Sequence, residues 1–380
     1  MPGERFGRPQ LFALLLLFAF LLQSVWVIHR TPLRWAEGAY AQAGLDQLAG
    51  KLQPRDQGAL PVPAVIAATP VIIAHPFAAL RSPDSLKWLL RLPFVAFGWL
   101  LGASIWYVTR RLYGNAGGYV ALALYCSSPA VLFPWPGPLL AGSLGIFGTI
   151  FVATATAHTL YAPREASQLR SRWRRIVLLA LAIALAVGCG TWAILLVALG
   201  LAFMLYLVPE RRGAALALVV SACGVAAVLL LAFFGFRPRA FAGAFIHANW
   251  LPQRGMIGGE MVRAYLTGIV RPENSVLLLL TAMAVIAYFA SSRCRYFGNT
   301  APLLSLLVVT ALALVMFADV FVGPFPFRAT PFLYVFIAGV FADLLETRWR
   351  NPFRLLLLGL LAAYVATSVW GVFGTPPKVV

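Results

Sequence analysis

Apolar runs of membrane-spanning length recur along the whole chain, and they constrain its fold more than any other feature. The first covers residues 11–29 and the last covers residues 355–373. A helix needs roughly 20 apolar residues to cross the hydrocarbon core of a bilayer. Charged residues make up 11% of the chain, whereas they make up about 25% of a soluble domain. The sequence therefore predicts an all-α polytopic membrane protein.

The apolar runs predict about eleven transmembrane helices. The run at 176–208 is too long for one ordinary span, and Gly188-Cys189-Gly190-Thr191 predicts a break into two short helices. Together the helices predict a single transmembrane domain over residues 1–380. The predicted spans are 11–29, 88–109, 117–133, 139–160, two within 176–208, 214–236, 275–291, 301–322, 330–345 and 355–373.

Arginines in alternate short loops predict the orientation of the chain. Cytoplasmic loops carry an excess of Lys and Arg, and a cytoplasmic N-terminus places every arginine-rich short loop on that side. The two long loops, residues 30–87 and 237–274, then lie on the outer side. The pattern predicts a multi-pass protein of a bacterial-type inner (plasma) membrane. The basic loops contain residues 110–111, 164–175, 211–212, 293–295 and 348–354.

Two segments of the first outer loop predict interfacial helices. In residues 37–52, Tyr40, Gly44 and Leu48 recur at helical spacing, with polar side chains elsewhere on the helix. Residues 61–80 are apolar enough to span, but prolines interrupt them, and a crossing here would invert every later basic loop. We therefore expect an interfacial or re-entrant helix in this segment.

Charge and metal-ligand residues exclude several classes of function. The net charge is +18, but most of the basic residues fall in short loops, where topology explains them better than nucleic-acid binding does. The four cysteines and four histidines show no paired spacing, so no zinc motif, disulfide framework or other metal site is visible. Few ionisable residues fall inside the predicted spans, which disfavours a transporter.

Several short motifs, in their order along the chain, resemble those of the GT-C membrane glycosyltransferases. The resemblance is to the branch of protein O-mannosyltransferases and lipid A aminoarabinose transferases. It implies a GT-C-like fold whose outer face transfers a sugar from a polyprenyl-phosphate carrier to an acceptor. The motifs are Trp35-Ala36-Glu37-Gly38-Ala39-Tyr40-Ala41, Arg91-Leu92-Pro93-Phe94, Arg110-Arg111-Leu112-Tyr113-Gly114, Ser128-Pro129 and Phe327-Arg328-Ala329-Thr330-Pro331.

The resemblance implies that Glu37 is the catalytic general base, which takes the proton of the acceptor. The first acid of the family's acidic pair falls on Ala36 in this chain, and the loop at 134–138 contains no acid. The alternative is that Glu37 is a first-turn acid that complements a helix dipole. No cofactor is predicted; some family members use a divalent metal, but no ligand cluster is visible here.

Arginines in the outer loops are the candidate phosphate-binding residues. Arg237 and Arg254 lie in the long loop at 237–274, and Arg328 lies in a turn rich in proline and phenylalanine. Arginine binds phosphate through two parallel hydrogen bonds, so these residues could cradle a lipid phosphate. The alternative is interfacial anchoring by snorkelling side chains and, for Arg328, a structural pair with Asp319.

Two hypotheses for the function follow. The first is a glycosyltransferase that uses a polyprenyl-phosphate sugar as its donor. The second is a non-catalytic GT-C-fold relative that serves as a structural or assembly subunit beside partner membrane proteins. Both predict contact with membrane lipid, and both exclude nucleic acid as a partner.

Overall fold

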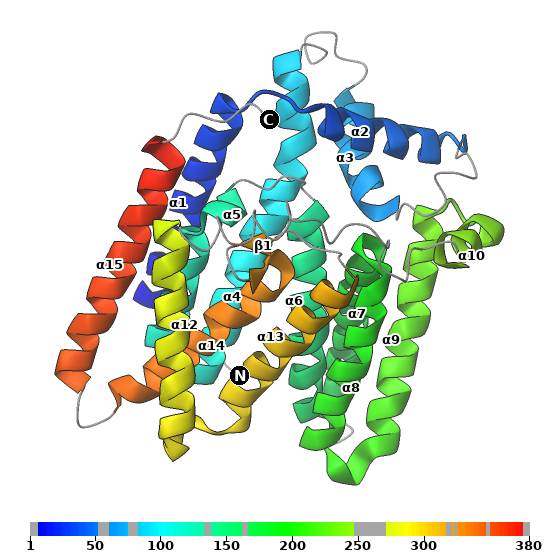
Figure 1. Cartoon of the computed structure of the whole chain (residues 1–380). Coiled ribbons are helices and arrows are strands. Elements are labelled where there is room, and N and C mark those ends of the chain that lie inside the picture. The colour runs from blue at the N-terminus through cyan, green and yellow to red at the C-terminus, as the bar shows by residue number, and fades with distance from the viewer. Residues whose placement is uncertain are drawn as a thin grey trace. The chain divides into compact units, whose positions relative to one another are not determined.

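The computed structural model describes residues 7–51, 61–74, 83–132, 138–161, 166–246, 271–316, 321–322, 325–346 and 350–374. Helices form nearly all of this part of the chain (Figure 1). The α-helices are α1 (Arg8–Arg30), α2 (Trp35–Leu48), α3 (Pro61–Ala74), α4 (Pro83–Cys126), α5 (Pro129–Leu132), α6 (Pro138–Ala157), α7 (Ala166–Cys189), α8 (Ile194–Leu207), α9 (Arg212–Phe233), α10 (Pro238–Ile246), α12 (Pro272–Ala290), α13 (Phe297–Met316), α14 (Thr330–Leu345) and α15 (Arg350–Gly374). Short 3-10 turns are η3 (His158–Tyr161), η4 (Thr191–Ala193), η5 (Pro209–Arg211), η6 (Ser292–Cys294) and η7 (Phe327–Ala329).

The chain forms two compact units, each of which combines segments that are distant in sequence. The first unit contains Met1–Thr31, Gly98–Pro134 and Arg254–Val380, and the second contains Pro32–Phe97 and Trp135–Gln253. The chain passes from the second unit to the first within α4. The expectation of one transmembrane domain over residues 1–380 stays a prediction.

Within the described residues, seven helices are long and apolar enough to cross a membrane. The chain is therefore an all-α, multi-pass membrane protein, as the sequence predicts. The predicted number of about eleven spans and the predicted orientation stay predictions, and a reporter fused after Leu160 would test the orientation. The seven helices are Arg8–Arg30, Asp84–Cys126, Leu139–Leu160, Pro209–Phe233, Phe297–Val315, Phe327–Leu345 and Asn351–Phe373; shorter apolar helices are Val62–Ala74, Thr191–Leu207 and Asn274–Ala290.

Two predicted helix breaks are confirmed. The apolar run at 176–208 divides into α7, which ends at Cys189, and α8, which begins at Ile194. The second break lies inside α4, where Gly114 has a left-handed φ of 75°. Glycine reaches this region without the clash that a Cβ causes, and a turn therefore separates the two predicted spans of this helix.

Two predicted helix boundaries are wrong, and one helix was not predicted. The unpredicted helix is α10, Pro238–Ile246, which lies within the segment 237–274; the outer loop predicted there stays a prediction. The helix predicted at 301–322 does not extend to Val322. The described part of this helix is α13, Phe297–Met316, and Phe321–Val322 pairs with Phe325–Pro326 as an antiparallel strand pair, β1 and β2. The helix predicted at 117–133 ends at Cys126, because Ser128-Pro129 starts the separate short helix α5.

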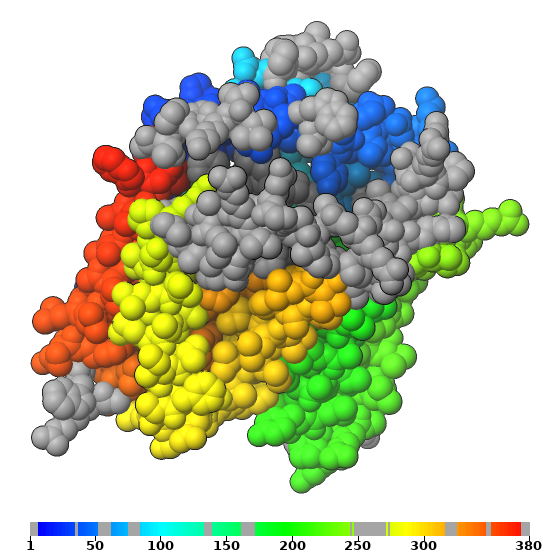
Figure 2. All heavy atoms as spheres, viewed as in Figure 1, coloured from blue at the N-terminus to red at the C-terminus, as the bar shows by residue number. Residues whose placement is uncertain are grey.

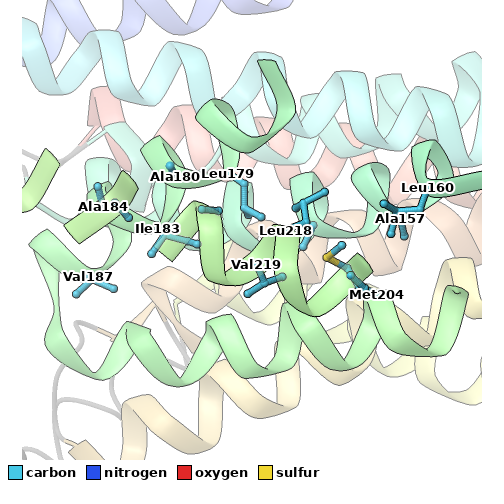
Figure 3. Close-up of a cluster of buried hydrophobic side chains, with 14 of the residues drawn as sticks. Ala157, Leu160, Leu179, Ala180, Ile183, Ala184, Val187, Met204, Leu218 and Val219 are labelled. Carbon is cyan, nitrogen blue, oxygen red and sulfur yellow. The ribbon is translucent and has the colours of Figure 1, made fainter. Parts of the chain in front are cut away.

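The core of the second unit lies among α6, α7, α8 and α9. Apolar side chains such as Leu179, Met204 and Leu218 fill it (Figure 3). Glycine permits a close helix contact in this core: a Cβ added at Gly145 of α6 would lie 2.3 Å from the backbone nitrogen of Ala186 in α7. Small residues let membrane helices approach closely and gain van der Waals contact.

The helices of the first outer loop, α2 and α3, pack against each other through small residues. The backbone of α3 at Ala64 lies 2.1 Å from the position that a Cβ on Gly44 would occupy. Gly44 and Ala41 are therefore on the inner face of α2, whereas Tyr40 and Leu48 are 39% and 49% exposed. The predicted helix is confirmed, but its larger apolar side chains point outward.

The first unit is built around α14. Residues 330–341 of this helix are buried, and α12, α13 and α15 lie beside it. The outward faces of α12 and α15, yellow and orange-red in Figure 2, carry large apolar side chains; Phe289 and Leu355 are 65% and 72% exposed. Such faces suit contact with lipid, because lipid does not penalise exposed apolar area as water does.

Polar contacts fasten the end of α14 to the start of α13. The buried amide of Asn299 donates to Asp343 Oδ2 at 2.7 Å and to the Cys294 carbonyl at 2.9 Å. Tyr296 donates to the other oxygen of Asp343 at 3.3 Å. Burial, the largest cause, and the nearby Asp343 carboxylate raise the pKa of the Tyr296 phenol well above its ordinary value, so this phenol is a donor at neutral pH.

Candidate functional site

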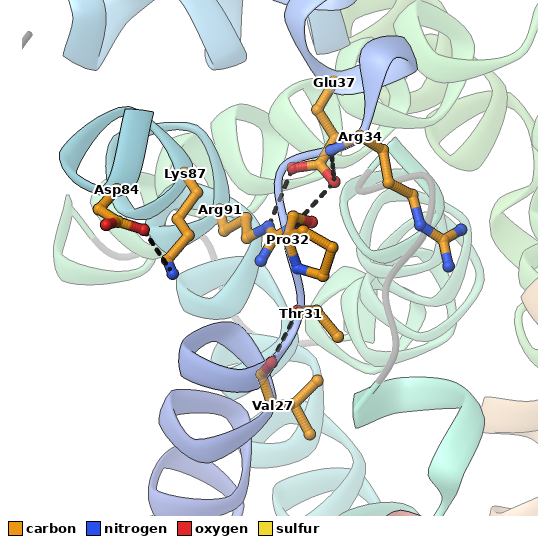
Figure 4. Close-up of polar contacts among 8 residues, drawn as sticks. All are labelled: Val27, Thr31, Pro32, Arg34, Glu37, Asp84, Lys87 and Arg91. Atoms are coloured by element: carbon orange, nitrogen blue, oxygen red, sulfur yellow. Dashed lines mark hydrogen bonds and ion pairs between the residues drawn. The ribbon is translucent and has the colours of Figure 1, made fainter. Parts of the chain in front are cut away.

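The predicted catalytic acid, Glu37, forms a bidentate ion pair with Arg91 inside the second unit (Figure 4). Arg91 Nε donates to Glu37 Oε2 at 2.9 Å, and Arg91 Nη2 donates to Glu37 Oε1 at 2.9 Å. The same Nη2 also donates to the carbonyl of Pro32 at 2.7 Å. The guanidinium group therefore ties the start of α2, the segment before it and α4 together.

Local structure positions both partners. Glu37 is the third residue of α2, and its Oε1 accepts a hydrogen bond of 3.3 Å from the backbone N–H of Arg34 just before the helix. An acid in the first turn is favoured because unpaired N–H groups give the helix N-terminus a partial positive charge. Arg91 lies inside α4, whose rigid backbone fixes the origin of its side chain.

Burial makes this ion pair strong and difficult to open. The side chains of Arg91 and Glu37 are 3% and 11% exposed, so solvent screens their attraction weakly. Removing one partner of such a pair leaves an uncompensated charge and typically costs about 3–5 kcal/mol. The Glu37 carboxylate is therefore held in one orientation with its charge compensated.

The same hydrogen bonds limit what Glu37 can do chemically. An ionised carboxylate offers about four acceptor positions, and three bonds occupy it here: two from Arg91 and one from the Arg34 N–H. A general base needs a free acceptor position aimed at the proton it removes. Glu37 retains room for about one further hydrogen bond, and its neighbour Ala36 supplies no second carboxylate.

Two other acids of the first outer loop, Asp84 and Asp46, have partners of their own. Asp84 is 89% exposed and pairs with Lys87 at 3.0 Å (Figure 4). The carboxylate of Asp46 accepts a hydrogen bond from Gln42 at 3.0 Å on the exposed side of α2. Neither contact brings a second carboxylate to Glu37.

Arg237, a predicted phosphate-binding residue, lies where the ends of α2 and α9 meet. Its Nη2 is 2.3 Å from the position that a Cβ on Gly50 would occupy, and Gln47 of α2 donates to the Phe233 carbonyl of α9 at 2.9 Å. Two helix C-termini carry partial negative charge, so a guanidinium group and an amide donor both stabilise their meeting. Along α2, Gly50 is roughly 20 Å from Glu37 at 1.5 Å per residue, so Arg237 and Glu37 do not share one site.

Arg328 is buried, with 6% of its surface exposed, in the turn η7 just before α14 of the first unit. The role of Arg328 in binding phosphate and a joint site of Arg328 with Glu37 stay predictions. Arg254 lies outside the described residues, as do Asp319 and Glu260.

The residue that the sequence analysis missed as a site residue is Arg91. It was noted only as part of the Arg91-Leu92-Pro93-Phe94 motif, although that motif and Trp35–Ala41 both carry the resemblance. Because both segments resemble motifs of one family, the sequence offered a signal that they could contribute to one site. In the structure the two segments are joined by the ion pair of Glu37 with Arg91.

Metal ligands do not cluster in the described part of the chain: no group of three or more His, Cys, Asp or Glu side chains there could hold an ion. Searches against protein-family models and against curated proteins find no match to this chain.

Proposed function

We propose that this chain is a GT-C-type membrane protein in which Glu37 is a structural residue, and that it serves as a non-catalytic structural or assembly subunit of a larger membrane complex. The observation that carries the proposal is the buried bidentate pair of Glu37 with Arg91. The resemblance implies that an acid in the segment Trp35–Ala41 acts as the general base. Glu37 is the acid in this segment, and its carboxylate already accepts hydrogen bonds from Arg91 and from the N-terminus of α2.

The geometry of the pair opposes base catalysis. A general base needs a free acceptor position aimed at the proton it removes, and three hydrogen bonds already occupy the Glu37 carboxylate. Ala36 offers no second carboxylate to take over the reaction. As a structural element, by contrast, the pair fixes the first outer loop to α4 through three hydrogen bonds to Glu37 and Pro32.

The second candidate is a glycosyltransferase that uses a polyprenyl-phosphate sugar. Two observations favour it: the remaining exposure of Glu37, 11%, and the buried arginine at the resemblance motif before α14, Arg328. In this reading Glu37 uses its remaining acceptor position for the acceptor proton, and Arg328 neutralises the phosphate of the carrier.

Exchanging the charges of the pair distinguishes the two functions. We would express the chain in its source cells as wild type, as Glu37→Gln, and as the exchange Glu37→Arg with Arg91→Glu. Blue native electrophoresis would report complex assembly, and mass spectrometry of lipid extracts would report the pool of polyprenyl-phosphate sugars. A matched control is Asp84→Asn, which removes an acid of the same loop whose side chain is 89% exposed and should change neither readout.

For a structural subunit, Glu37→Gln disrupts the complex, the exchange at least partly restores it, and deletion of the chain leaves the sugar pool unchanged. Two results together would refute the proposal. Deletion of the chain would enlarge the pool of one polyprenyl-phosphate sugar, and Glu37→Gln and the charge exchange would both enlarge that pool to the same extent while the complex stays intact. That outcome would identify Glu37 as the base and the chain as a transferase.

A further inference from the structure

The corner between α9 and α10 turns an aromatic side chain outward. The helix α9 ends in a Schellman motif: the Gly235 N–H donates to the Ala232 carbonyl at 2.9 Å and the Phe236 N–H donates to the Leu231 carbonyl at 3.0 Å. Gly235 is left-handed, with φ 60°, as this motif requires. Phe236 follows it, and 65% of its surface is exposed.

The backbone at Phe236 is strained in a way that this motif does not require. Its φ is 56°, a left-handed conformation that a residue with a Cβ disfavours. The apolar residue at this position of a Schellman motif commonly packs back onto the helix, but Phe236 is exposed instead. Among the described residues, no other residue except glycine has a positive φ, and such strain often marks functional positions.

The helix that follows has an apolar inner face and a basic outer side. Phe241 lies 5.7 Å from Phe234 between ring centroids, and it packs on the core of the second unit. On the outer side, Arg237 and Arg239 are exposed and Ile246 is 73% exposed. Figure 1 shows α10 lying across the end of α9.

Position along the chain indicates what covers this corner. The span Pro209–Phe233 ends three residues before Phe236, so the corner lies where the hydrocarbon core gives way to lipid headgroups. Residues 235–246 contain two arginines and no acid. Aromatic side chains favour this depth of a bilayer, and arginines there attract anionic headgroups.

We propose that the α9–α10 corner, residues 235–246, is a binding site for anionic phospholipid headgroups. Phe236 and Ile246 lie at the boundary with the acyl chains, and Arg239 contacts lipid phosphate, assisted by Arg237. The site anchors α10 and, through the contact of Arg237 with Gly50, the end of α2. This inference does not depend on the proposed function, because it holds for a transferase and for a subunit.

Hydrogen–deuterium exchange in lipid nanodiscs tests the site. We would compare discs of phosphatidylcholine with discs that also contain phosphatidylglycerol, and measure exchange of the amides of α10. A basic residue near an anionic surface contributes ~1 kcal/mol, so exchange should slow in the anionic discs by about fivefold for each arginine engaged. Arg239→Gln should remove about fivefold of this protection. Arg212→Gln, an exposed arginine at the other end of α9, is the matched control and should remove none.

A second variant keeps the test decisive if an arginine change disturbs folding. Phe236→Gly relieves the left-handed strain and preserves the Schellman motif, so the protein should keep its thermal stability in detergent while α10 loses protection in both kinds of disc. Equal protection in the two discs, unaffected by either Arg239→Gln or Phe236→Gly, would overturn the proposal. Protection that appears in native membranes but in neither disc would also overturn it, and would identify a partner protein as the occupant.

Discussion

A single methyl group added at Gly145 should separate two helices of the second unit. In Gly145→Ala the new Cβ would lie 2.3 Å from the nitrogen and 2.7 Å from the Cα of Ala186 in α7. Carbon contacts are optimal at roughly 3.5–4.0 Å, so the helices must part by about 1 Å or more. The obstacle is backbone, which cannot rotate away as a flexible side chain can.

The same substitution at Gly224 has the opposite expectation. Gly224 is an exposed residue of α9, and a Cβ added there meets nothing within 4 Å. Alanine in a helix is favoured over glycine by about 0.5–1 kcal/mol, so Gly224→Ala should be neutral or stabilising. Overpacking at Gly145 should cost about 1–3 kcal/mol. Because both substitutions share the gain in helix propensity, the two variants should differ by about this amount.

The assay is thermal unfolding of the purified protein in detergent, followed by tryptophan fluorescence and by loss of the monodisperse peak in size-exclusion chromatography. Gly145→Ala should lower the Tm, whereas Gly224→Ala should leave it equal or higher. Gly148→Ala should be intermediate, because its Cβ would meet the small side chain of Ala182 at 3.0 Å. An equal Tm for the Gly145 and Gly224 variants would refute the close helix contact.

Three further predictions concern turns and polar contacts. Gly50→Ala should lower the Tm, because Gly50 has a φ of 73° and the guanidinium of Arg237 occupies the space of the new Cβ. The control is Gly38→Ala within α2, the helix that Gly50 follows, because the space for a Cβ is open there. Asn299→Leu should cost about 1–3 kcal/mol of unfolding free energy, because it removes the buried donor to Asp343, and a normal Tm would contradict this. The Cys294 thiol should react slowly with N-ethylmaleimide at pH 8, because Cys294 is 1% exposed and burial raises the pKa of its thiol. The thiolate is the reactive form, so the labelling rate should keep rising at pH values above the ordinary pKa of a thiol. Labelling should become fast when the protein is unfolded.

The site illustrates how far a sequence motif can lead. The resemblance pointed to Glu37 and quoted Arg91, but it gave no indication that the two form a pair. Their separation along the chain is large, and pairing depends on how α2 returns toward α4. For the same reason the charge of Arg237 could suggest a phosphate contact, but not that its guanidinium also lies against Gly50 at the end of α2.

Helix α10 was missed for a related reason. Residues 238–246 are too few to form a span and were embedded in a segment rich in polar residues. Short helices are marginal by themselves in solution, and this one is stabilised by packing of Phe241 on the core.

The sequence by itself determined the class of protein, the positions of most helices and two of the breaks between them. Hydrophobic length sets a membrane helix almost independently of its neighbours, because every backbone polar group must be satisfied within the segment. Gly114 marks a break by local geometry, because its left-handed φ favours glycine. The tertiary structure decided which face of α2 points inward, which cation compensates Glu37 and which helices meet at Gly145. Those features depend on contacts between segments far apart in the chain, and side-chain periodicity carries no information about which distant partner a residue will meet.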